Sequence, residues 1–278
     1  MRVSPAGVAE IALAYEEHQA WPSEVTGAAA RYFLSTLPGS PRRCLFLGAA
    51  TGANDALPFA RIADPRDRIL AGDIESGFLD RLRARAADEG IRNVEARLLD
   101  VTTDLSPLGE FDLITLLFVI HRLKSWESVV DRLGRLVSPG GSFFISEFAG
   151  PSGVIYLSNE RGGEGSDPVS RVIRRYFELL PERFAPPLKS TCIGPVLERL
   201  GTDLKPMGHR DFIWRQRVTA RGMFQKIEER AYAPFFSTHP APAVLGPLRD
   251  EFATEMDRPV PLEETIRIYR FGRPKDVT

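Results

Sequence analysis

The sequence predicts an α/β protein built on a doubly wound, mostly parallel β-sheet. Short apolar segments alternate with amphipathic helical segments between residues 43 and 148, and this alternation is typical of a parallel sheet with helices on both faces. The first apolar segment, Cys44–Leu47, ends in a glycine-bounded turn, Gly48–Gly52. Two later apolar segments end in Asp73 and Asp100. Ligands of such sheets bind beyond the carboxyl ends of the strands, so this edge is the expected site.

The order of apolar and polar residues assigns the elements of this central region. The expected strands are Cys44–Leu47, Arg68–Ala71, Val94–Leu99, Phe111–Phe118 and Ser142–Ser146. The expected helices are Ala53–Ala63, Glu75–Glu89 and Ser125–Val137. The helix at 75–89 has one apolar face, and the strand at 111–118 is almost wholly apolar, as expected of a strand buried on both faces.

Helices and two further strands are expected on either side of this region. Residues 1–42 read as two helices that are broken at Trp21-Pro22. A glycine-rich loop at 150–165 is followed by expected helices at Pro168–Leu180, Ile193–Leu200, Ala220–Ala231 and Val244–Met256. Alternating strands at Phe212–Val218 and Thr265–Phe271 would complete a seven-stranded sheet, the last strand antiparallel.

Composition and charge exclude several classes of function. A chain of 278 residues with 43% hydrophobic residues can bury a full core. The net charge of −1 gives no indication of nucleic acid or anionic membrane as a partner. No Cys/His cluster has metal-ligand spacing, so no metal is expected. The chain has neither a membrane-spanning apolar run nor a signal-peptide pattern, so we expect a cytoplasmic protein. The oligomeric state is not indicated.

The turn at residues 48–52 can bring free backbone N–H groups close to a ligand. Gly48 and Gly52 alone do not make the G-x-G-x-x-G pattern of a dinucleotide site. Asp73 follows at about twenty residues, a distance from which an acid can accept hydrogen bonds from ribose hydroxyls. The sequence therefore indicates a nucleoside-containing ligand and leaves its identity open.

Taken in order, these motifs resemble class I S-adenosylmethionine-dependent methyltransferases, of the small-molecule, ubiquinone/menaquinone-methyltransferase-like type, across about residues 10–148. The first strand and turn of that family, V-L-D-L-G-C-G-T-G, align with Cys44–Gly52. A family segment often ending L-H-H-L aligns with Ile120–Leu123, and an L-x-P-G-G turn aligns with Leu136–Gly141. The resemblance implies a Rossmann-like fold with S-adenosyl-L-methionine as the methyl donor.

The resemblance also implies which residues contact the cofactor. Asp73 would hold the ribose diol, with Ile74 against the adenine, and Asp100 and Val101 would lie near the adenine amino group. Tyr15 corresponds loosely to a family tyrosine that reaches the cofactor carboxylate. The full expected set is Tyr15, Gly48, Ala50, Thr51, Gly52, Asp73, Ile74, Asp100, Val101 and Leu117.

Two positions depart from the family pattern. Phe46 stands where the family has an acid near the methionine part of the cofactor, and Ala50 stands where the family has a glycine. Ala50 is expected to take a negative φ and only to tighten the turn. Asp55 or Glu147 could supply the missing carboxylate.

Methyl transfer from a sulfonium requires alignment of donor and acceptor, and an acceptor that carries a proton also needs a base. His121, after the fourth strand, and Glu147, at the end of the fifth, are the candidate catalytic residues. Aromatic and arginine side chains after residue 150 favour a small organic substrate, aromatic or anionic. The predicted parts are an N-terminal helical segment over the cofactor (1–42), a cofactor-binding core (43–148), a substrate cap containing strand six (149–230), and a C-terminal helix with the last strand (231–278).

Two alternatives stay open at this point. A nicotinamide short-chain reductase has a similar glycine turn, but the chain lacks the required Tyr-x-x-x-Lys pair after Tyr156. A catalytically silent S-adenosylmethionine-binding protein would be consistent with Phe46 and Ala50.

Overall fold

The computed structural model describes residues 12, 13, 16, 20–120, 123–149, 167–179, 193–225 and 241–275. The chain divides into two compact units. The first comprises Met1–Glu147, Cys192–Phe212 and Arg267–Thr278, and the second comprises Phe148–Thr191 and Ile213–Ile266. No helix within the described ranges is long and apolar enough to cross a membrane.

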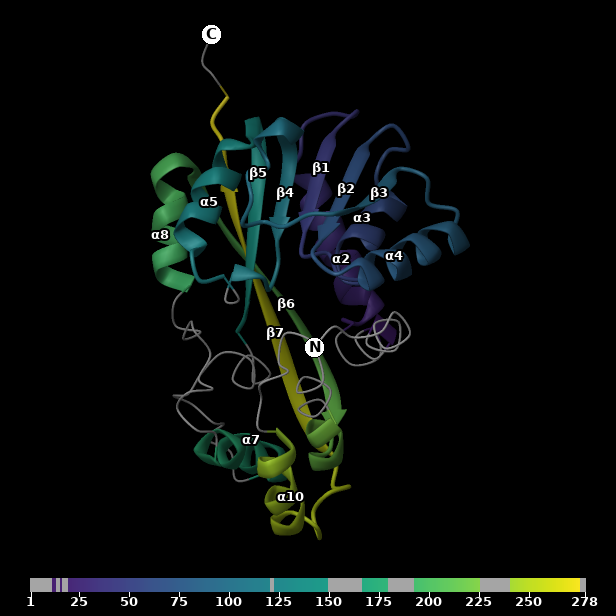
Figure 1. The fold of residues 1–278 in the computed structure, drawn as a ribbon, viewed down its shortest axis with the longest axis vertical. Coiled ribbons are helices and arrows are strands. Elements are labelled where there is room, and N and C mark those ends of the chain that lie inside the picture. The colour runs from purple at the N-terminus through teal and green to yellow at the C-terminus, as the bar shows by residue number, and fades with distance from the viewer. Residues whose placement is uncertain are drawn as a thin grey trace. The chain divides into compact units, whose positions relative to one another are not determined.

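A seven-stranded sheet organises the fold (Figure 1). Its strands are β1 (Arg43–Leu47), β2 (Arg68–Asp73), β3 (Val94–Leu98), β4 (Phe111–Leu116), β5 (Val137–Phe148), β6 (Lys205–Val218) and β7 (Val260–Gly272). Their spatial order is β3-β2-β1-β4-β5-β7-β6. The helices are α2 (Ser23–Ser35), α3 (Ala56–Ile62), α4 (Ser76–Asp88), the short 3₁₀ helix η1 (Ser106–Leu108), α5 (Trp126–Arg135), α7 (Pro168–Leu179), α8 (Ile193–Asp203) and α10 (Ala241–Glu251).

Strands β1 to β5 are parallel, and β7 runs against them. Leu47 of β1 lies opposite Leu116 of β4, which lies opposite Ile145 of β5. Along β5 and β7 the paired positions run in opposite directions, because Gly140 N–H bonds to the Arg273 carbonyl and Ala149 N–H to the Thr265 carbonyl. The predicted seven-stranded, mostly parallel, Rossmann-like sheet with an antiparallel last strand is thus confirmed.

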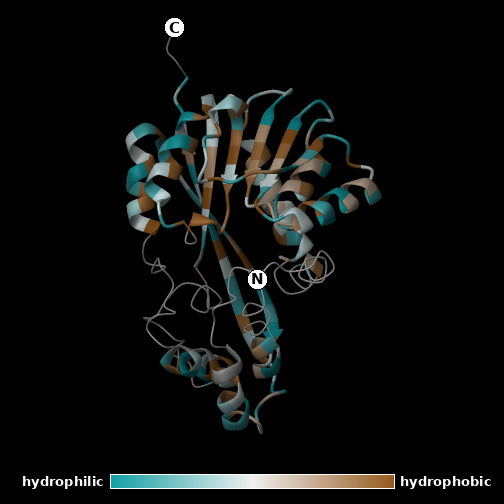
Figure 2. Ribbon diagram, in the orientation of Figure 1, coloured by the Kyte–Doolittle hydropathy of each residue, from teal (hydrophilic) through white to brown (hydrophobic). Residues whose placement is uncertain are grey.

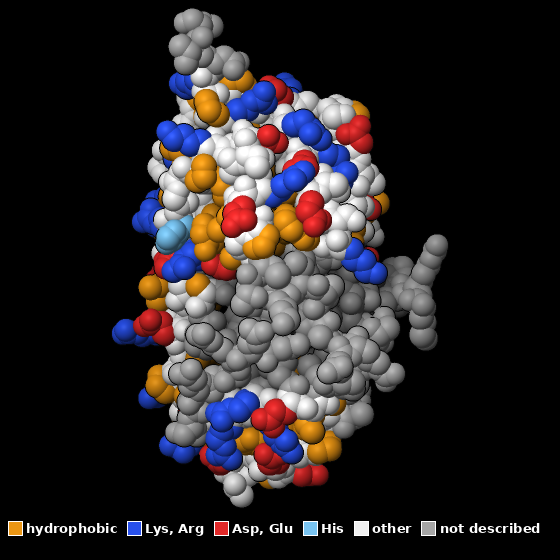
Figure 3. Space-filling model, turned by 90° about the vertical axis from the view of Figure 1, so that its left-hand side faces the viewer, with side chains coloured by type: hydrophobic (Ala, Val, Ile, Leu, Met, Phe, Trp, Pro, Cys, Tyr) orange, Lys and Arg blue, Asp and Glu red, His pale blue; other side chains and the backbone are white. Residues whose placement is uncertain are grey.

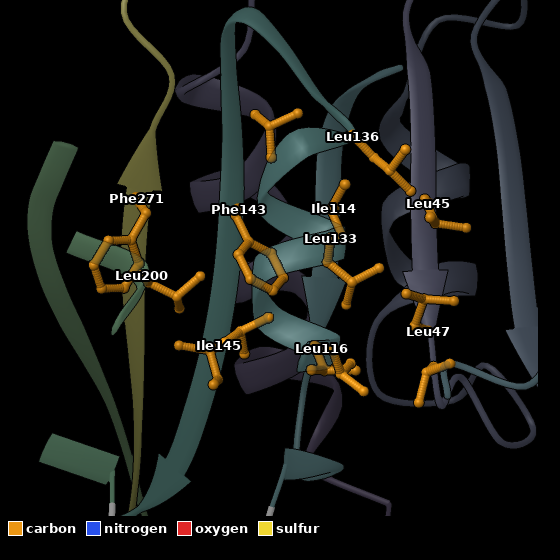
Figure 4. Close-up of a cluster of buried hydrophobic side chains, with 14 of the residues drawn as sticks. Leu45, Leu47, Ile114, Leu116, Leu133, Leu136, Phe143, Ile145, Leu200 and Phe271 are labelled. Carbon is orange, nitrogen blue, oxygen red and sulfur yellow. The ribbon is translucent and has the colours of Figure 1, made fainter. Parts of the chain in front are cut away.

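Helices cover both faces of the sheet, as the alternation of side chains along β5 shows. Phe143 and Ile145 pack in one buried cluster with Leu133 of α5 and Leu200 of α8 (Figure 4). Phe144 lies between them in sequence and contacts Phe33 of α2, with the ring centroids 4.7 Å apart. Successive residues of a strand point to opposite faces, so α2 and the pair α5/α8 cover opposite faces of the sheet.

Burial follows the position of each strand in the sheet. The side chains of β1 from Cys44 to Leu47 and most of those in β2 and β4 are buried, and Figure 2 shows the inner strands as predominantly hydrophobic. Edge strand β3 is largely exposed. Helix α4 buries Phe78, Leu79, Leu82 and Ala86, the apolar face expected from its sequence. On the side that carries α8, basic and acidic side chains are interspersed (Figure 3).

Several boundaries differ from the expected ones. Strand β4 ends at Leu116 instead of Phe118, and β5, β6 and β7 are longer than predicted. Helix α2 begins directly after Pro22, in agreement with the expected break. The helix expected at 220–231 begins at Ala220, and its part beyond Gln225 lies outside the described residues, as does the loop expected at 150–165.

The second unit has its own hydrophobic core. Its buried side chains come from α7, the helix that begins at Ala220, and α10 together with the residues after it: Val169, Val172, Tyr176, Ala220, Met223, Phe224, Val244, Leu245, Leu248 and Phe252. Ion pairs between Arg171 and Glu255 and between Arg221 and Asp257 connect the same elements. Because this cluster is separate from that of the first unit, the two units have independent cores.

Phe46 tests how the first strand contributes to stability. Its side chain is fully buried and packs against Phe59 of α3, with the ring centroids 5.3 Å apart. Phe46→Ala should lower the free energy of unfolding by about 3–5 kcal/mol, the usual loss for a buried phenylalanine. Urea unfolding would measure it, with Ile62→Ala on the exposed side of α3 as the control. A loss as small as that of the control would mean that the Phe46 ring does not belong to the core.

Candidate functional site

In the turn after β1, every second residue from position 48 to position 52 has a left-handed backbone conformation. Gly48, Ala50 and Gly52 have φ values of 67°, 47° and 71°. The expectation of a negative φ at Ala50 is therefore wrong. This conformation is strained for a residue with a Cβ atom, and a hydrogen bond offsets the strain, because the Ala50 N–H donates to Asp73 Oδ2 at 2.9 Å.

The two glycines are required by packing as well as by φ. A Cβ atom on Gly48 would lie 2.2 Å from Val119 Cγ2, and one on Gly52 would lie 2.9 Å from Leu82 Cδ1. Neither position can carry a side chain unless its neighbours move. The chain's own side chains thus approach the turn closely at both glycines.

Asp73 connects three elements at the carboxyl edge of the sheet. It is the last residue of β2, and its two carboxylate oxygens accept the N–H of Ala50 at 2.9 Å and the N–H of Glu75 at 3.0 Å. Its backbone carbonyl also accepts the N–H of Leu99. A carboxylate oxygen can accept more than one hydrogen bond, so the bonds to Ala50 and Glu75 do not by themselves exclude a donor from a ligand.

Exposed apolar side chains lie beside Asp73. Ile74 is 49% exposed and Leu98 is 61% exposed, and Leu98 lies opposite Asp73 in the β2·β3 ladder. An exposed apolar surface at the end of two strands could pack against a flat aromatic ring. Asp100 is exposed, and its carboxylate accepts the N–H and the hydroxyl of Thr102 at 2.8 and 2.7 Å, whereas the Val101 side chain belongs to the buried core.

Two buried hydroxyl groups in this region have no hydrogen-bond partner among the described residues, Thr51 Oγ1 in the turn and Thr115 Oγ1 in β4. In the ladder Thr115 lies opposite Phe46 on one side and Phe144 on the other. An acid at position 46 would be a cross-strand neighbour of this hydroxyl. The departure at Phe46 therefore leaves an apolar row with one unsatisfied hydroxyl in its middle.

The segment after β4 leaves the sheet abruptly. Phe118 has a φ of 56°, and its N–H donates to Ser146 Oγ at 3.2 Å instead of continuing the ladder. Its ring contacts Trp21, and the Trp21 N–H donates to Asn54 Oδ1 at 2.9 Å. Leu117, an expected cofactor contact, is buried here. The start of α2 is thus attached both to the glycine turn and to the segment after β4.

The N-terminal segment also contacts the turn. Ala12 forms a small buried cluster with Ala50 and Phe78. Glu16 pairs with Arg81 and Arg85 of α4 at 2.9 and 3.1 Å, and these hydrogen bonds and charges lower the pKa of Glu16 against the effect of its partial burial. Tyr15 lies outside the described residues, so its expected contact with the cofactor stays a prediction.

Of the two candidate bases, the structure places one. Glu147, near the end of β5, accepts a hydrogen bond from the Tyr269 hydroxyl at 2.5 Å. His121 lies outside the described residues. Within the described ranges no group of three His, Cys, Asp or Glu side chains could hold a metal ion.

A second carboxylate is buried behind the glycine turn. Asp55 is almost fully buried, and its side chain accepts the N–H of Ala56 at 2.6 Å at the start of α3. Burial raises the pKa of Asp55 to about 7, and the nearby charge of Asp73 acts in the same direction, whereas the Ala56 hydrogen bond opposes the shift. Asp55 therefore binds a proton in a pH range in which an exposed aspartate is charged.

Comparison with known proteins identifies this arrangement. A family model described as a methyltransferase domain matches residues 45–143. An uncharacterized methyltransferase of Mycobacterium tuberculosis is 33% identical over 101 residues, which are 36% of this chain and 50% of the relative. The ubiquinone/menaquinone biosynthesis C-methyltransferase UbiE of Azotobacter vinelandii is 30% identical over 125 residues, 44% of this chain and 49% of the relative. Within the first unit, residues 45–143 thus match a methyltransferase domain.

Solved structures show that the likeness in fold extends over most of the chain. A putative methyltransferase from Bacillus halodurans has a TM-score of 0.57 at 14% identity, covering 90% of this chain and 99% of that one. The [4+2]-cyclase SpnF has a TM-score of 0.54 at 15% identity, covering 90% and 81%. Coclaurine N-methyltransferase bound to N-methylheliamine and S-adenosylhomocysteine has a TM-score of 0.51 at 14% identity, covering 88% and 72%. The chain spans about half the length of the curated relatives that it matches.

Some site features of the methyltransferase domain were missed in the sequence. Leu98 is exposed because it lies on the edge strand β3, opposite Asp73. The expected strand order would have been enough to predict this exposure. The contact between Glu147 and Tyr269 joins residues 122 positions apart. The alternation in the last strand does place Arg267, Tyr269 and Phe271 on one face. It does not indicate which strand is the neighbour that these side chains contact.

Asp55 should make the stability of the domain depend on pH. Its folded pKa lies above its unfolded value of about 3.9, so the native state holds the extra proton between about pH 4 and pH 7. Stability should therefore fall as the pH rises through this window. Asp55→Asn keeps an acceptor for Ala56 N–H but cannot ionise, so urea unfolding between pH 5 and 8 should show a smaller pH dependence and higher stability at pH 8. The exposed Asp88→Asn is the control. An unchanged slope in Asp55→Asn would contradict the assignment.

Proposed function

We propose that this protein is an active S-adenosylmethionine-dependent methyltransferase that transfers a methyl group to a small organic molecule. The observation that carries the proposal is the pair of hydrogen bonds made by Asp73, which fix the glycine turn after β1 and the start of α4 at the carboxyl edge of the sheet. The match of residues 45–143 to a methyltransferase domain supports it.

The residues at this edge fit the cofactor at several points. The carboxylate of Asp73 suits ribose hydroxyls, and the exposed Ile74 and Leu98 suit an adenine ring. The buried hydroxyl of Thr51, which has no partner among the described residues, would bond to a polar group of the ligand. Backbone groups of Gly48, Ala50, Thr51 and Gly52 would line the methionine part, while contacts from Tyr15, Asp100, Val101 and Leu117 stay proposals. The buried Phe46 offers no charge there.

The cofactor's sulfonium supplies an already activated methyl group, so the protein mainly has to align donor and acceptor and exclude water. An oxygen or nitrogen acceptor would release a proton, which His121 or Glu147 would take up. Residues 149–230 would contribute the binding of the acceptor. A small aromatic or anionic acceptor is proposed from the aromatic and arginine side chains of this range. Coclaurine N-methyltransferase, which has a similar fold, binds a small organic molecule.

Two observations favour a second candidate function. Phe46 is buried where the family has an acid, and a cyclase shares this fold at a TM-score of 0.54, which shows that the fold also occurs outside methyl transfer. A protein that binds S-adenosylmethionine without transferring its methyl group is therefore the alternative. A screen of small phenols, amines and acids with labelled S-adenosylmethionine would separate the two.

S-adenosylhomocysteine should bind and raise the melting temperature, because a ligand of the native state stabilises it by mass action. Asp73→Ala should lose about 1.5–3 kcal/mol of binding free energy, since hydrogen bonds to a charged group contribute this much. Isothermal titration calorimetry measures the loss.

The exposed Asp88→Ala serves as the matched control and should bind as the wild type does. Asp73 also holds Ala50, so the melting temperature of each variant without ligand separates a loss of folding from a loss of contact. Stabilisation by NADH with none by S-adenosylhomocysteine would overturn the proposal.

A further inference from the structure

A second group of polar side chains lies in the first unit at the carboxyl end of β5, away from the glycine turn. Glu147 points to the same face of the sheet as Ile145, and Tyr269 packs against the buried cluster that includes Ile145 and Phe271. We call this group the β5–β7–β6 polar cluster. Its members are Glu147 of β5, Arg267 and Tyr269 of β7, and His209 and Asp211 of β6.

The hydrogen bonds of this cluster have a defined direction. Asp211 receives two hydrogen bonds from Arg267, at 2.7 and 2.8 Å. They raise the pKa of Arg267, and the neighbouring Tyr269 acts in the same direction. A carboxylate has no proton to donate when it is ionised, so the hydroxyl of Tyr269 is the donor. Its single proton goes to Glu147 Oε1, at 2.5 Å.

Tyr269 remains a donor over the whole physiological pH range. Burial, and then the hydrogen bond and charge of Glu147, raise the pKa of Tyr269 to about 12, although Arg267 acts against this shift. The His209 ring lies 5.5 Å from the Tyr269 ring between centroids. Asp211 holds the Arg267 guanidinium, and the charge of Arg267 acts on the Tyr269 hydroxyl, so both residues shape the surroundings in which Tyr269 donates to Glu147.

Glu147 lies at the same edge of the sheet as the glycine turn. Leu47, Leu116 and Ile145 are opposite one another in β1, β4 and β5, and Glu147 follows Ile145 by two residues. Two strand spacings separate β5 from β1, about 10 Å. Its neighbour Ser146 accepts the N–H of Phe118, where the chain leaves β4. Among the described residues no donor contacts Glu147 Oε2, so one carboxylate oxygen is held and the other is available.

We propose that Tyr269 is a positioning residue that holds Glu147 as the carboxylate facing the transferred methyl group and its acceptor. The inference rests on the proposed function. The acceptor oxygen or nitrogen forms a bond to the methyl carbon, the sulfur–methyl bond breaks with its electron pair on sulfur, and the acceptor's proton passes to Glu147. Tyr269 does not touch the reacting atoms and acts through Glu147.

Two cofactor analogues test this without a known acceptor. S-adenosylhomocysteine lacks the methyl group, whereas sinefungin carries an ammonium group on carbon where the cofactor has its sulfonium methyl. A carboxylate near this ammonium group favours the binding of sinefungin. The ratio of the affinities for sinefungin and S-adenosylhomocysteine therefore measures whether the Glu147 carboxylate lies at this point. We expect Glu147→Gln to lower this ratio about 10- to 100-fold, as for a lost hydrogen bond between charged groups, and to leave S-adenosylhomocysteine affinity unchanged.

Tyr269→Phe removes one oxygen atom and should lower the ratio in the same direction, by about three- to tenfold, because the carboxylate is retained but less firmly held. Tyr32→Phe is the matched control. Tyr32 is also half-buried in the first unit, but it lies on the α2 face, where its ring contacts Phe33 and Phe144. It should leave the ratio unchanged.

The affinity ratio also separates positioning from packing. Tyr269 of β7 contacts Glu147 directly, and Asp211 and His209 of β6 lie behind it. A packing role alone would lower the melting temperature of Tyr269→Phe and leave its affinity ratio unchanged.

Each outcome decides a different point. If S-adenosylhomocysteine does not bind the wild type, the proposed function fails, whatever happens at Tyr269. If it binds but Glu147→Gln leaves the ratio unchanged, Glu147 is not at the transfer point. A changed ratio in Glu147→Gln with an unchanged ratio in Tyr269→Phe overturns the positioning role. Should Tyr269→Phe not fold, Asp211→Asn loosens Arg267 at a greater distance from Glu147, and the same decrease is expected.

Discussion

The carboxylate of Asp73 is the interaction on which the carboxyl edge of the sheet depends. It accepts one hydrogen bond from the turn after β1 and one from the residue before α4, so the turn after β1, the end of β2 and the start of α4 meet at the same group. Without it, the positive φ of Ala50 would have no compensating bond. The side chain proposed to hold the ribose is thus also the one that shapes the turn, so in the proposed function ligand binding and local structure would share one residue.

The same edge shows how the domain distributes charge around the position where its relatives carry an acid. Phe46 and Phe144 make the row through Thr115 apolar, and the two carboxylates nearest the turn, Asp73 and Asp55, lie outside that row. Their mutual repulsion, added to burial, favours the protonated form of Asp55. A ligand that brings positive charge to this edge would relieve the repulsion, and a sulfonium with an α-ammonium group has that charge. In the proposed function this positive charge would favour the ionised form of Asp55, and the counter-charge would then come from Asp55 and Asp73 instead of from position 46.

Most of the fold could be predicted because it follows from local patterns. The apolar segment at Phe111–Leu116 and the apolar face of α4 have the periodicity of the elements they form. Two of the errors come from single hydrogen bonds between distant residues. Ala50 takes a positive φ because of Asp73, and β4 stops at Leu116 because Phe118 bonds to Ser146. A negative φ at Ala50 and a strand that continues to Phe118 are both compatible with the local sequence. The distant partners, Asp73 and Ser146, cannot be inferred from the pattern of either segment. The positions of Asp73 and Glu147 at strand ends were predictable, but their partners were not.

The antiparallel direction of β7 explains why the polar cluster forms at all. In a parallel sheet every carboxyl end meets the same edge, so the residues near that edge come from the ends of strands. Strand β7 enters from the second unit and passes this edge with its middle residues, so Arg267 and Tyr269 reach Glu147 from inside a continuous strand. Residues held on both sides by strand pairing are fixed more firmly than residues of a terminal loop. A carboxylate that must keep one orientation is therefore better held by β7 than by any of the loops that follow the parallel strands.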